Sequence, residues 1–216
     1  MVPLGSLEQH GPHLPLDTDT RIAVAVAERA CAARAGVGLA PPVAIGASGE
    51  HAGFPGTLSI GTTALTLLLV ELGRHASLHW PAMLLVNGHG GNAPAIADAL
   101  RQLSAEGRQC HVWHAGLRPG VAMRDVADAH AGRMETSVML ALAPGDVRTT
   151  AAAPGETQPL AEIMPDLRAR GVRAISENGV LGDPSGASAA EGERLLGMLV
   201  ADLNQTVDSL LNGAVR

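Results

Sequence analysis

The amino-acid sequence predicts a three-layer α/β/α domain built on a mainly parallel sheet. Short apolar segments alternate along the chain with longer segments of helical periodicity, and the links between them are short. This alternation favours helices on both faces of one sheet, because strands joined through helices run parallel. The chain has 216 residues, 46% of them hydrophobic, and no internal repeat. We therefore expect one domain covering residues 1–216.

Four apolar segments are expected to be strands, because each is short and bounded by turn residues. They cover residues 2–5, 39–46, 83–88 and 110–115. The Pro- and Gly-rich stretch 144–159 is interpreted as a surface excursion and not as a domain boundary.

Five segments with helical periodicity are expected to be helices. They cover residues 20–35, 62–79, 92–107, 132–142 and 187–211. The first three begin at possible N-caps, which are Thr20, Thr62 and Asn92. Two of them are followed by glycines that suit a helix end, Gly36 and Gly107.

Composition limits the partners and the location of the protein. A formal net charge of −6 without a basic block argues against nucleic acid. The longest apolar run, residues 64–70, is far shorter than the roughly 20 residues that cross a bilayer, so no membrane partner is expected. The N-terminus lacks a secretory pattern, and two distant cysteines, Cys31 and Cys110, favour a reduced, cytoplasmic protein.

The chain is poor in aromatic residues, with two Trp, one Phe and no Tyr. Its core must therefore be built from aliphatic side chains, which bury less area per residue. Burial at subunit contacts would offset that deficit, so a homo-oligomer is expected.

Polar clusters follow three of the predicted strands, and ligand sites in α/β proteins gather at the carboxyl ends of strands. Each cluster contains a histidine or carboxylate of the kind that binds metal ions. The clusters are 5-GSLEQHGPHLPLDTD-19, 87-NGHGGN-92 and 130-HAGRMETS-137.

In the first cluster, two prolines exclude a regular helix. Residues two apart in an extended segment point the same way, so Glu8 and His10 could face one site while Gln9 turns away. Asp17 and Asp19 repeat that spacing just before a helix, where only one of them need point inward. The alternative is a polar loop with capping aspartates.

The second cluster could cradle a phosphate on backbone N–H groups, but it matches neither GxGxxG nor GxxxxGK[ST]. His89 between glycines suits a metal ligand better. The alternative is a tight turn whose histidine points to solvent.

In the third cluster, Glu135 could simply complement a helix dipole. Thr136 and Ser137 follow it and are poor interior helix residues unless their hydroxyls are used.

Four blocks resemble the signature blocks of the creatininase (creatinine amidohydrolase) family, in the same order and over almost the whole chain. They are 4-LGSLEQHGPHLPLDTDT-20, 87-NGHGGN-92, 130-HAGRMETS-137 and 179-GVLGDPSGASAAEG-192. The resemblance implies a creatininase-type α/β/α fold, a two-metal amidohydrolase site and a homo-oligomer, with a hexamer favoured. Each subunit would hold two divalent ions, Zn²⁺ and/or Fe²⁺, with Mn²⁺ also possible.

The resemblance also implies which residues bind the metals. The first metal would be held by Glu8, Asp19 and His89, and the second by His10, Asp19 and Glu135, with Asp19 bridging both. Creatininase itself supplies a Glu two residues after the NGH histidine, and here that position is Gly91. Glu135 is the candidate replacement. Arg133 stands where many relatives place another acid.

His130 matches the catalytic histidine of the family and would pass a proton to the leaving nitrogen. The two ions would activate a water and polarise an amide carbonyl. Three further residues are expected to support or line the site: His13, Glu50 and His51. His75 and His79 are expected to lie far from it, in solvated or capping positions.

Within the family, residues 116–129 lack the tryptophans that close the creatininase pocket, which argues against creatinine as substrate. The segments 17-DTDTRIA-23, 46-GASGEHAGFPGTLSIGT-62 and 179–192 most resemble a peptidase branch. That branch releases a C-terminal Val-Tyr dipeptide from a modified precursor peptide during redox-cofactor biosynthesis. One alternative is a family member that hydrolyses a small cyclic amide or formamide. Another is a non-enzymatic phosphate- or nucleotide-binding module that uses NGHGGN.

Overall fold

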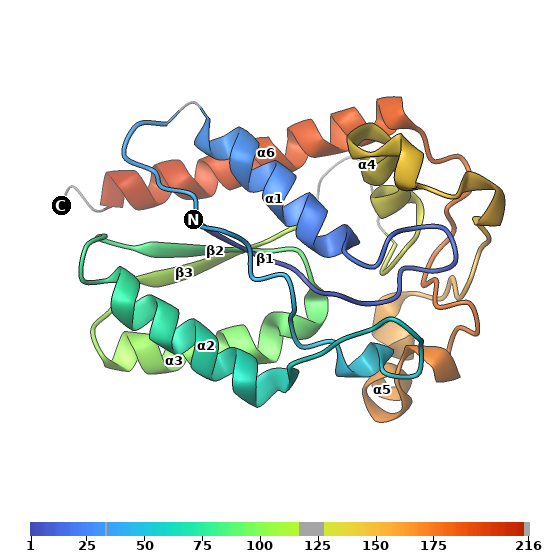
Figure 1. The fold of residues 1–216 in the computed structure, drawn as a ribbon, viewed down its shortest axis with the longest axis horizontal. Helices are drawn as coiled ribbons and strands as arrows, with labels where there is room; N and C mark the ends of the chain where they lie inside the picture. Colours follow the sequence, from blue (N-terminus) through green and yellow to red (C-terminus); the bar gives the residue numbers. More distant parts are fainter. Residues whose placement is uncertain (33, 117–127, 214–216) are drawn as a thin grey trace.

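The protein is described by a computed structural model over residues 1–32, 34–116 and 128–213. Three strands form one parallel sheet, with β2 in the middle. They are β1 (Val2–Leu4), β2 (Met83–Asn87) and β3 (Cys110–His114). Figure 1 shows helices on both faces of this sheet. The predicted three-layer α/β/α arrangement with a parallel sheet is therefore confirmed.

Two cores lie on opposite faces of the sheet. Leu84 and Val86 of β2 face a core shared with α1 (Thr18–Cys31), α4 (Arg133–Leu142) and α6 (Ala189–Gly213). Met83 and Leu85 face a core shared with α2 (Gly61–Ala76) and α3 (Ala93–Ala105). Because both of its faces are covered, β2 is apolar from Met83 to Val86 and lacks polar alternation.

The strand predicted over residues 39–46 is not formed. Val43 makes only an isolated parallel bridge to Leu4, although its N–H donates to Pro3 O at 2.9 Å and its O accepts from Gly5 N at 3.0 Å. Pro41 and Pro42 have no N–H to donate, so a continuous ladder cannot form beside β1.

The five predicted helices are present with shifted ends. The helices α1 and α2 begin before the predicted caps, so Thr20 and Thr62 lie inside them. Asn92 precedes α3 but does not cap it with its side chain. Instead, its Oδ1 accepts from Ala47 N at 2.8 Å and its Nδ2 donates to Gly5 O at 3.0 Å. Asn92 thus ties the loops that follow β1 and β2 to the segment around Ala47.

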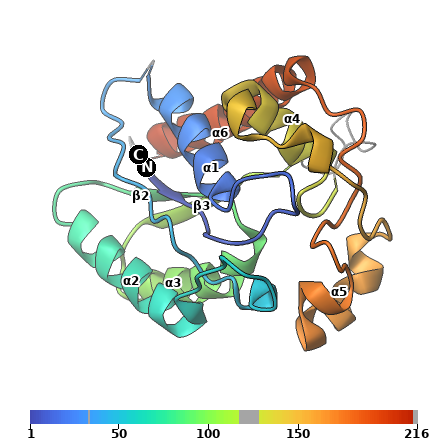
Figure 2. The same ribbon diagram turned by 45° about the vertical axis from the view of Figure 1, so that its right-hand side comes forward.

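One helix was not predicted. The helix α5 (Leu160–Arg170) contains Pro165, a residue that disfavours the interior of a helix. Figure 2 shows α5 at the edge of the molecule, and it packs against the turns Gly49–His51 and Val172–Ala174. The stretch 144–159 contains two short 3₁₀ turns. Among the described helices, none is long and apolar enough to cross a membrane.

Candidate metal centre

The five predicted ligands and His130 lie together, in the loops that follow the strands and in the first turns of α1 and α4. Five of these six side chains are buried, and Glu135 is half-buried. Three groups of them offer ligand atoms within 4.8 Å of one another. The groups are Glu8–Asp19–His89, His10–Asp19–Glu135 and Glu8–His10–His130. The first two contain the same residues that were predicted for the two metals, and both contain Asp19.

Asp19 lies in the first turn of α1 and points inward, whereas Asp17 is partly exposed and pairs with Arg21 at 2.8 Å. The hydroxyl of Ser6 donates to Asp19 Oδ2 at 2.7 Å. Burial works to raise the pKa of Asp19, but His10 and His89 hold it well below its ordinary value. Asp19 is therefore an ionised carboxylate in the interior.

Each oxygen of Asp19 faces a histidine nitrogen. His10 Nδ1–H donates to Glu8 O at 3.1 Å, which leaves Nε2 3.0 Å from Asp19 Oδ1. His89 Nε2 contacts Ala47 O at 3.2 Å and, since a carbonyl only accepts, carries the proton. This leaves His89 Nδ1 3.1 Å from Asp19 Oδ2. If both imidazoles are neutral, His10 Nε2 and His89 Nδ1 each direct a lone pair at a carboxylate oxygen of Asp19. A cation or a proton is therefore needed between each nitrogen and the oxygen it faces.

Without a metal, a proton can take that place on His10. Burial works to lower the pKa of His10, but the charge and hydrogen bond of Asp19 dominate and raise it to about 10. A divalent ion would compete with this proton for the same lone pair.

Glu8 is fully buried, and within the described part of the chain neither of its carboxylate oxygens accepts a hydrogen bond. Its nearest polar neighbours are imidazoles, with His51 Nε2 3.2 Å from Oε1 and His89 Nε2 3.1 Å from Oε2. These imidazoles are near but not aligned for hydrogen bonds, and a buried carboxylate without well-formed hydrogen bonds is costly unless a cation compensates it. The donor set around Glu8 therefore fits a metal ion.

Glu135 approaches the cluster from the first turn of α4. Ala131 has a φ of 53°, in the left-handed region that non-glycine residues seldom adopt. Its N–H donates to Glu135 Oε2 at 2.6 Å, and that oxygen lies 3.9 Å from His10 Nε2. Burial raises the pKa of Glu135 to about 7, with His10 opposing and Asp19 adding to the rise.

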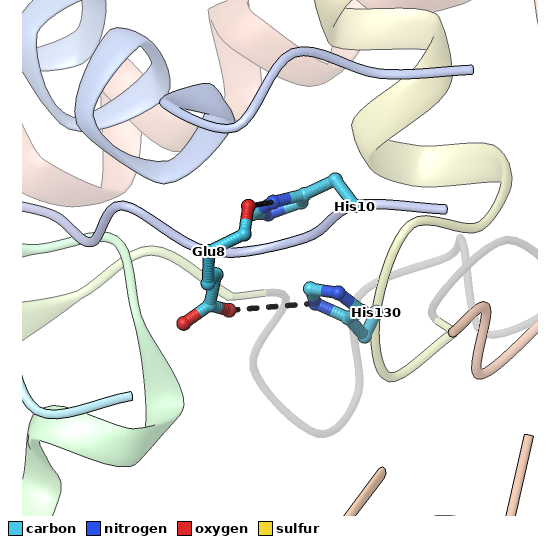
Figure 3. A group of neighbouring side chains, drawn as sticks. All are labelled: Glu8, His10 and His130. Atoms are coloured by element: carbon cyan, nitrogen blue, oxygen red, sulfur yellow. Dashed lines mark hydrogen bonds and ion pairs between the residues drawn. The ribbon is translucent and has the colours of Figure 1, made fainter. Parts of the chain in front are cut away.

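His130 is held in one orientation by backbone contacts. Its Nε2–H donates to Gln9 O at 2.7 Å, and its backbone pairs with Leu181 at 2.8 and 3.1 Å. Figure 3 shows the ring beside the Glu8 carboxylate, with Nδ1 3.8 Å from Glu8 Oε1. Burial, together with the nearby imidazole of His10, lowers the pKa of His130 well below its ordinary value. A neutral ring with a bare Nδ1 can take up a proton and release it again.

The side chain of Gln9 does not turn away from the site as predicted. It is buried, and its Nε2 donates to His51 Nδ1 at 2.9 Å and to Gly179 O at 3.0 Å. The prediction assumed an extended strand end, but β1 ends at Leu4 and the following residues form only isolated bridges. The alternation of a strand therefore does not apply there.

The NGHGGN turn points its histidine inward, so the interpretation of His89 as a solvent-facing residue is wrong. A Cβ added at Gly88 would lie 2.5 Å from Asp19 O, so a glycine is needed where the turn meets α1. Two carboxylates, Glu8 and Asp19, lie against His89. An anionic phosphate is disfavoured beside them.

The polar residues of α4 use their hydroxyls, as their poor helix propensity indicated. Thr136 Oγ1 contacts His13 Nε2 at 2.9 Å, and Ser137 donates to Glu191 Oε2 at 2.8 Å. Arg133 also pairs with Glu191, at 2.8 and 2.9 Å, so its guanidinium contacts α6.

The remaining sequence expectations concern residues outside the cluster. His75 and His79 are exposed at the C-terminal end of α2, consistent with the expectation. Most of the tryptophan-free segment 116–129 lies outside the described residues.

Comparisons with known proteins agree with this geometry. The family model described as Creatininase: Creatinine amidohydrolase matches residues 1–207. A mycofactocin precursor peptide peptidase of Mycolicibacterium smegmatis is 57% identical over 206 residues, covering 93% of this chain and 80% of the relative. The creatinine amidohydrolase of Pseudomonas putida is 30% identical over 234 residues, covering 96% of this chain and 87% of the relative.

Solved structures of creatininase have the same fold. A structure described as a Zn-Zn type mutant creatininase aligns with a TM-score of 0.76 at 28% identity, covering 97% of this chain and 89% of that one. A structure described as creatininase Mn aligns with a TM-score of 0.74 at 27% identity, with the same two coverages.

Proposed function

Because the chain belongs to the creatininase (creatinine amidohydrolase) family of hydrolases, we propose that it is a two-metal peptidase acting on the modified mycofactocin precursor peptide. The product would be the C-terminal Val-Tyr dipeptide. Relatives named mycofactocin precursor peptide peptidase are 51% to 57% identical over 93% to 94% of the chain. The creatinine amidohydrolase is more distant, at 30% identity.

The metal centre we propose contains two divalent ions that share Asp19. Glu8 and His89 would complete the first site, and His10 and Glu135 the second. The observation that carries this assignment is the pair of imidazole nitrogens, one facing each oxygen of Asp19. Zn²⁺ and Fe²⁺ suit the mixed nitrogen and carboxylate donors, as does Mn²⁺. Creatininase structures described as Zn-Zn and Mn types support the same choice.

When bound, such ions would lower the pKa of a water and polarise the scissile carbonyl. His130 would carry the proton to the leaving nitrogen through Nδ1, because Nε2 is engaged by Gln9 O. His51 would hold Glu8 in place, since Gln9 donates to its Nδ1 and its Nε2 faces Glu8 Oε1.

The test is incubation of the metal-loaded protein with the modified precursor peptide, with mass spectrometry of the released dipeptide. Release that stops after chelation and returns with Zn²⁺ or Fe²⁺ is the expected result. If no dipeptide is released and a small cyclic amide or formamide is hydrolysed instead, the alternative function as a small-amide hydrolase would replace this proposal.

We also propose that residues 1–216 fold as one domain and that this domain forms homo-oligomers, with a hexamer favoured by the family. Several large apolar side chains on and next to α2 are exposed, among them Leu67 at 60%, Leu78 at 64% and Trp80 at 50%. Such a patch favours contact with another subunit. Light scattering coupled to size exclusion would show a multiple of 22.0 kDa.

A cytoplasmic location stays a prediction. It is supported by two cysteines that are both free, Cys31 and Cys110.

A further inference from the structure

The three-residue turn Gly49–His51 brings a further carboxylate against the metal centre. Glu50 Oε1 lies 3.3 Å from His89 Nε2, the nitrogen that faces away from Asp19. The Glu50 side chain is 27% exposed, so it reaches His89 from the solvent side. It does not belong to any of the three ligand groups found among the described residues.

Gly91 leaves the space that the Glu50 carboxylate occupies. A Cβ added at Gly91 would stand 2.1 Å from Glu50 Oε1, 2.3 Å from His89 Nε2 and 2.7 Å from Ala47 O. Any side chain at this position would therefore displace Glu50, the His89 ring or the Ala47 carbonyl. The second glycine after His89 thus has a specific steric role.

Three acceptors lie near His89 Nε2. Glu8 Oε2 is 3.1 Å away and belongs to the proposed ligand set. The Ala47 carbonyl at 3.2 Å and the Glu50 carboxylate at 3.3 Å lie outside that set and have the same effect on His89. Both stabilise the tautomer with the proton on Nε2, which keeps the lone pair on Nδ1, 3.1 Å from Asp19 Oδ2. A carboxylate behind a ligating imidazole also makes the imidazole a stronger donor.

We propose that Glu50 is a positioning residue that holds the proton of His89 on Nε2 and so presents Nδ1 to the ion shared with Asp19. This inference rests on the proposed function, because it treats His89 as a metal ligand. Glu50 itself contacts the imidazole and not the ion.

The test measures Zn²⁺ binding by the full chain in competition with a chromophoric chelator. Glu50→Ala is compared with Glu50→Gln, whose amide oxygen can still accept the Nε2 proton. Glu193→Ala is the matched control, since Glu193 is exposed on α6. We expect Glu50→Ala to weaken one of two Zn²⁺ sites roughly 10- to 100-fold while still binding two ions at saturation. Glu50→Gln should recover most of the affinity, and Glu193→Ala should match the unchanged protein.

The absorption spectrum of the Co²⁺-loaded protein gives a second readout. It should change in Glu50→Ala and return in Glu50→Gln, with far-UV circular dichroism the same in all variants. Equal Zn²⁺ affinity in Glu50→Ala and the unchanged protein would overturn the inference. Loss of one ion at saturation would do so as well, because Glu50 would then be a ligand. An unchanged protein that binds no divalent ion would instead overturn the proposed function.

Discussion

The two halves of the cluster around Asp19 are built differently. In the first half, Glu8 and His89 are both buried and come from loops that directly follow β1 and β2. In the second half, Glu135 is half-buried, comes from a helix, and already accepts an N–H from Ala131. The first half thus depends on a cation to compensate Glu8, whereas the protein itself partly satisfies Glu135. This difference between Glu8 and Glu135 predicts that the first half binds its ion with higher affinity than the second half.

The largest effect is expected from Asp19→Asn, because Asp19 is shared by both halves. We expect both ions to be lost, with affinity falling more than about 100-fold, beyond the effect typical of residues that only support a ligand. Metal analysis after gel filtration, with Asp17→Asn as control, measures this. A variant that retains two ions would show that the halves do not share Asp19.

The next largest effect is expected from His130→Ala. This variant distinguishes a residue that carries a proton from one that binds a metal ion. Turnover should fall roughly 10²- to 10⁴-fold while the metal content stays unchanged. Peptide hydrolysis and metal analysis on the same sample test both parts. Loss of an ion would instead make His130 a ligand together with Glu8 and His10, the third group of neighbouring ligand atoms.

Glu8→Gln and Glu135→Gln compare the two halves directly. Each should remove one ion, but Glu135→Gln should leave the tighter site and Glu8→Gln the weaker one. We expect the remaining Zn²⁺ affinities to differ about tenfold, equivalent to roughly 1.4 kcal/mol. Competition titrations of the two variants measure the difference. Equal remaining affinities would mean that burial of Glu8 does not distinguish the halves.

Metal loading of the unchanged protein should leave the chemistry of the halves unaltered and change only the stability of the fold. At a free Zn²⁺ concentration about 100 times the dissociation constant, binding to the folded state alone adds about 2.7 kcal/mol. For a chain of this size, that raises the melting temperature by roughly 5–11 °C. Scanning calorimetry with and without a chelator gives the value, and a downward shift on loading would contradict the proposed centre.

The layer order and the loops that contain Glu8, His10 and His89 could be predicted from the sequence, because they depend on short-range patterns. Glu8, His10 and His89 stand in polar loops next to apolar strands, a position that can be recognised without coordinates. The strand expected over 39–46 failed because two adjacent prolines remove donors, an effect that an apolar count does not register.

Contacts between distant segments were harder to predict. Gln9 contacts His51 and Gly179 because the backbone after β1 is irregular. The contact of Glu50 with His89 depends on how a three-residue turn packs against NGHGGN, and no local pattern encodes that packing.

The backbone pairing of His130 with Leu181 has a consequence for how the protein is made. A chain emerging from the ribosome exposes Glu8 and Asp19 early, but Glu135 only after more than half of the residues, and Leu181 later still. The proposed centre and the pairing that orients His130 thus draw on residues from Glu8 to Leu181 at once. A fragment that ends before Leu181 should therefore lack the backbone contacts that fix His130.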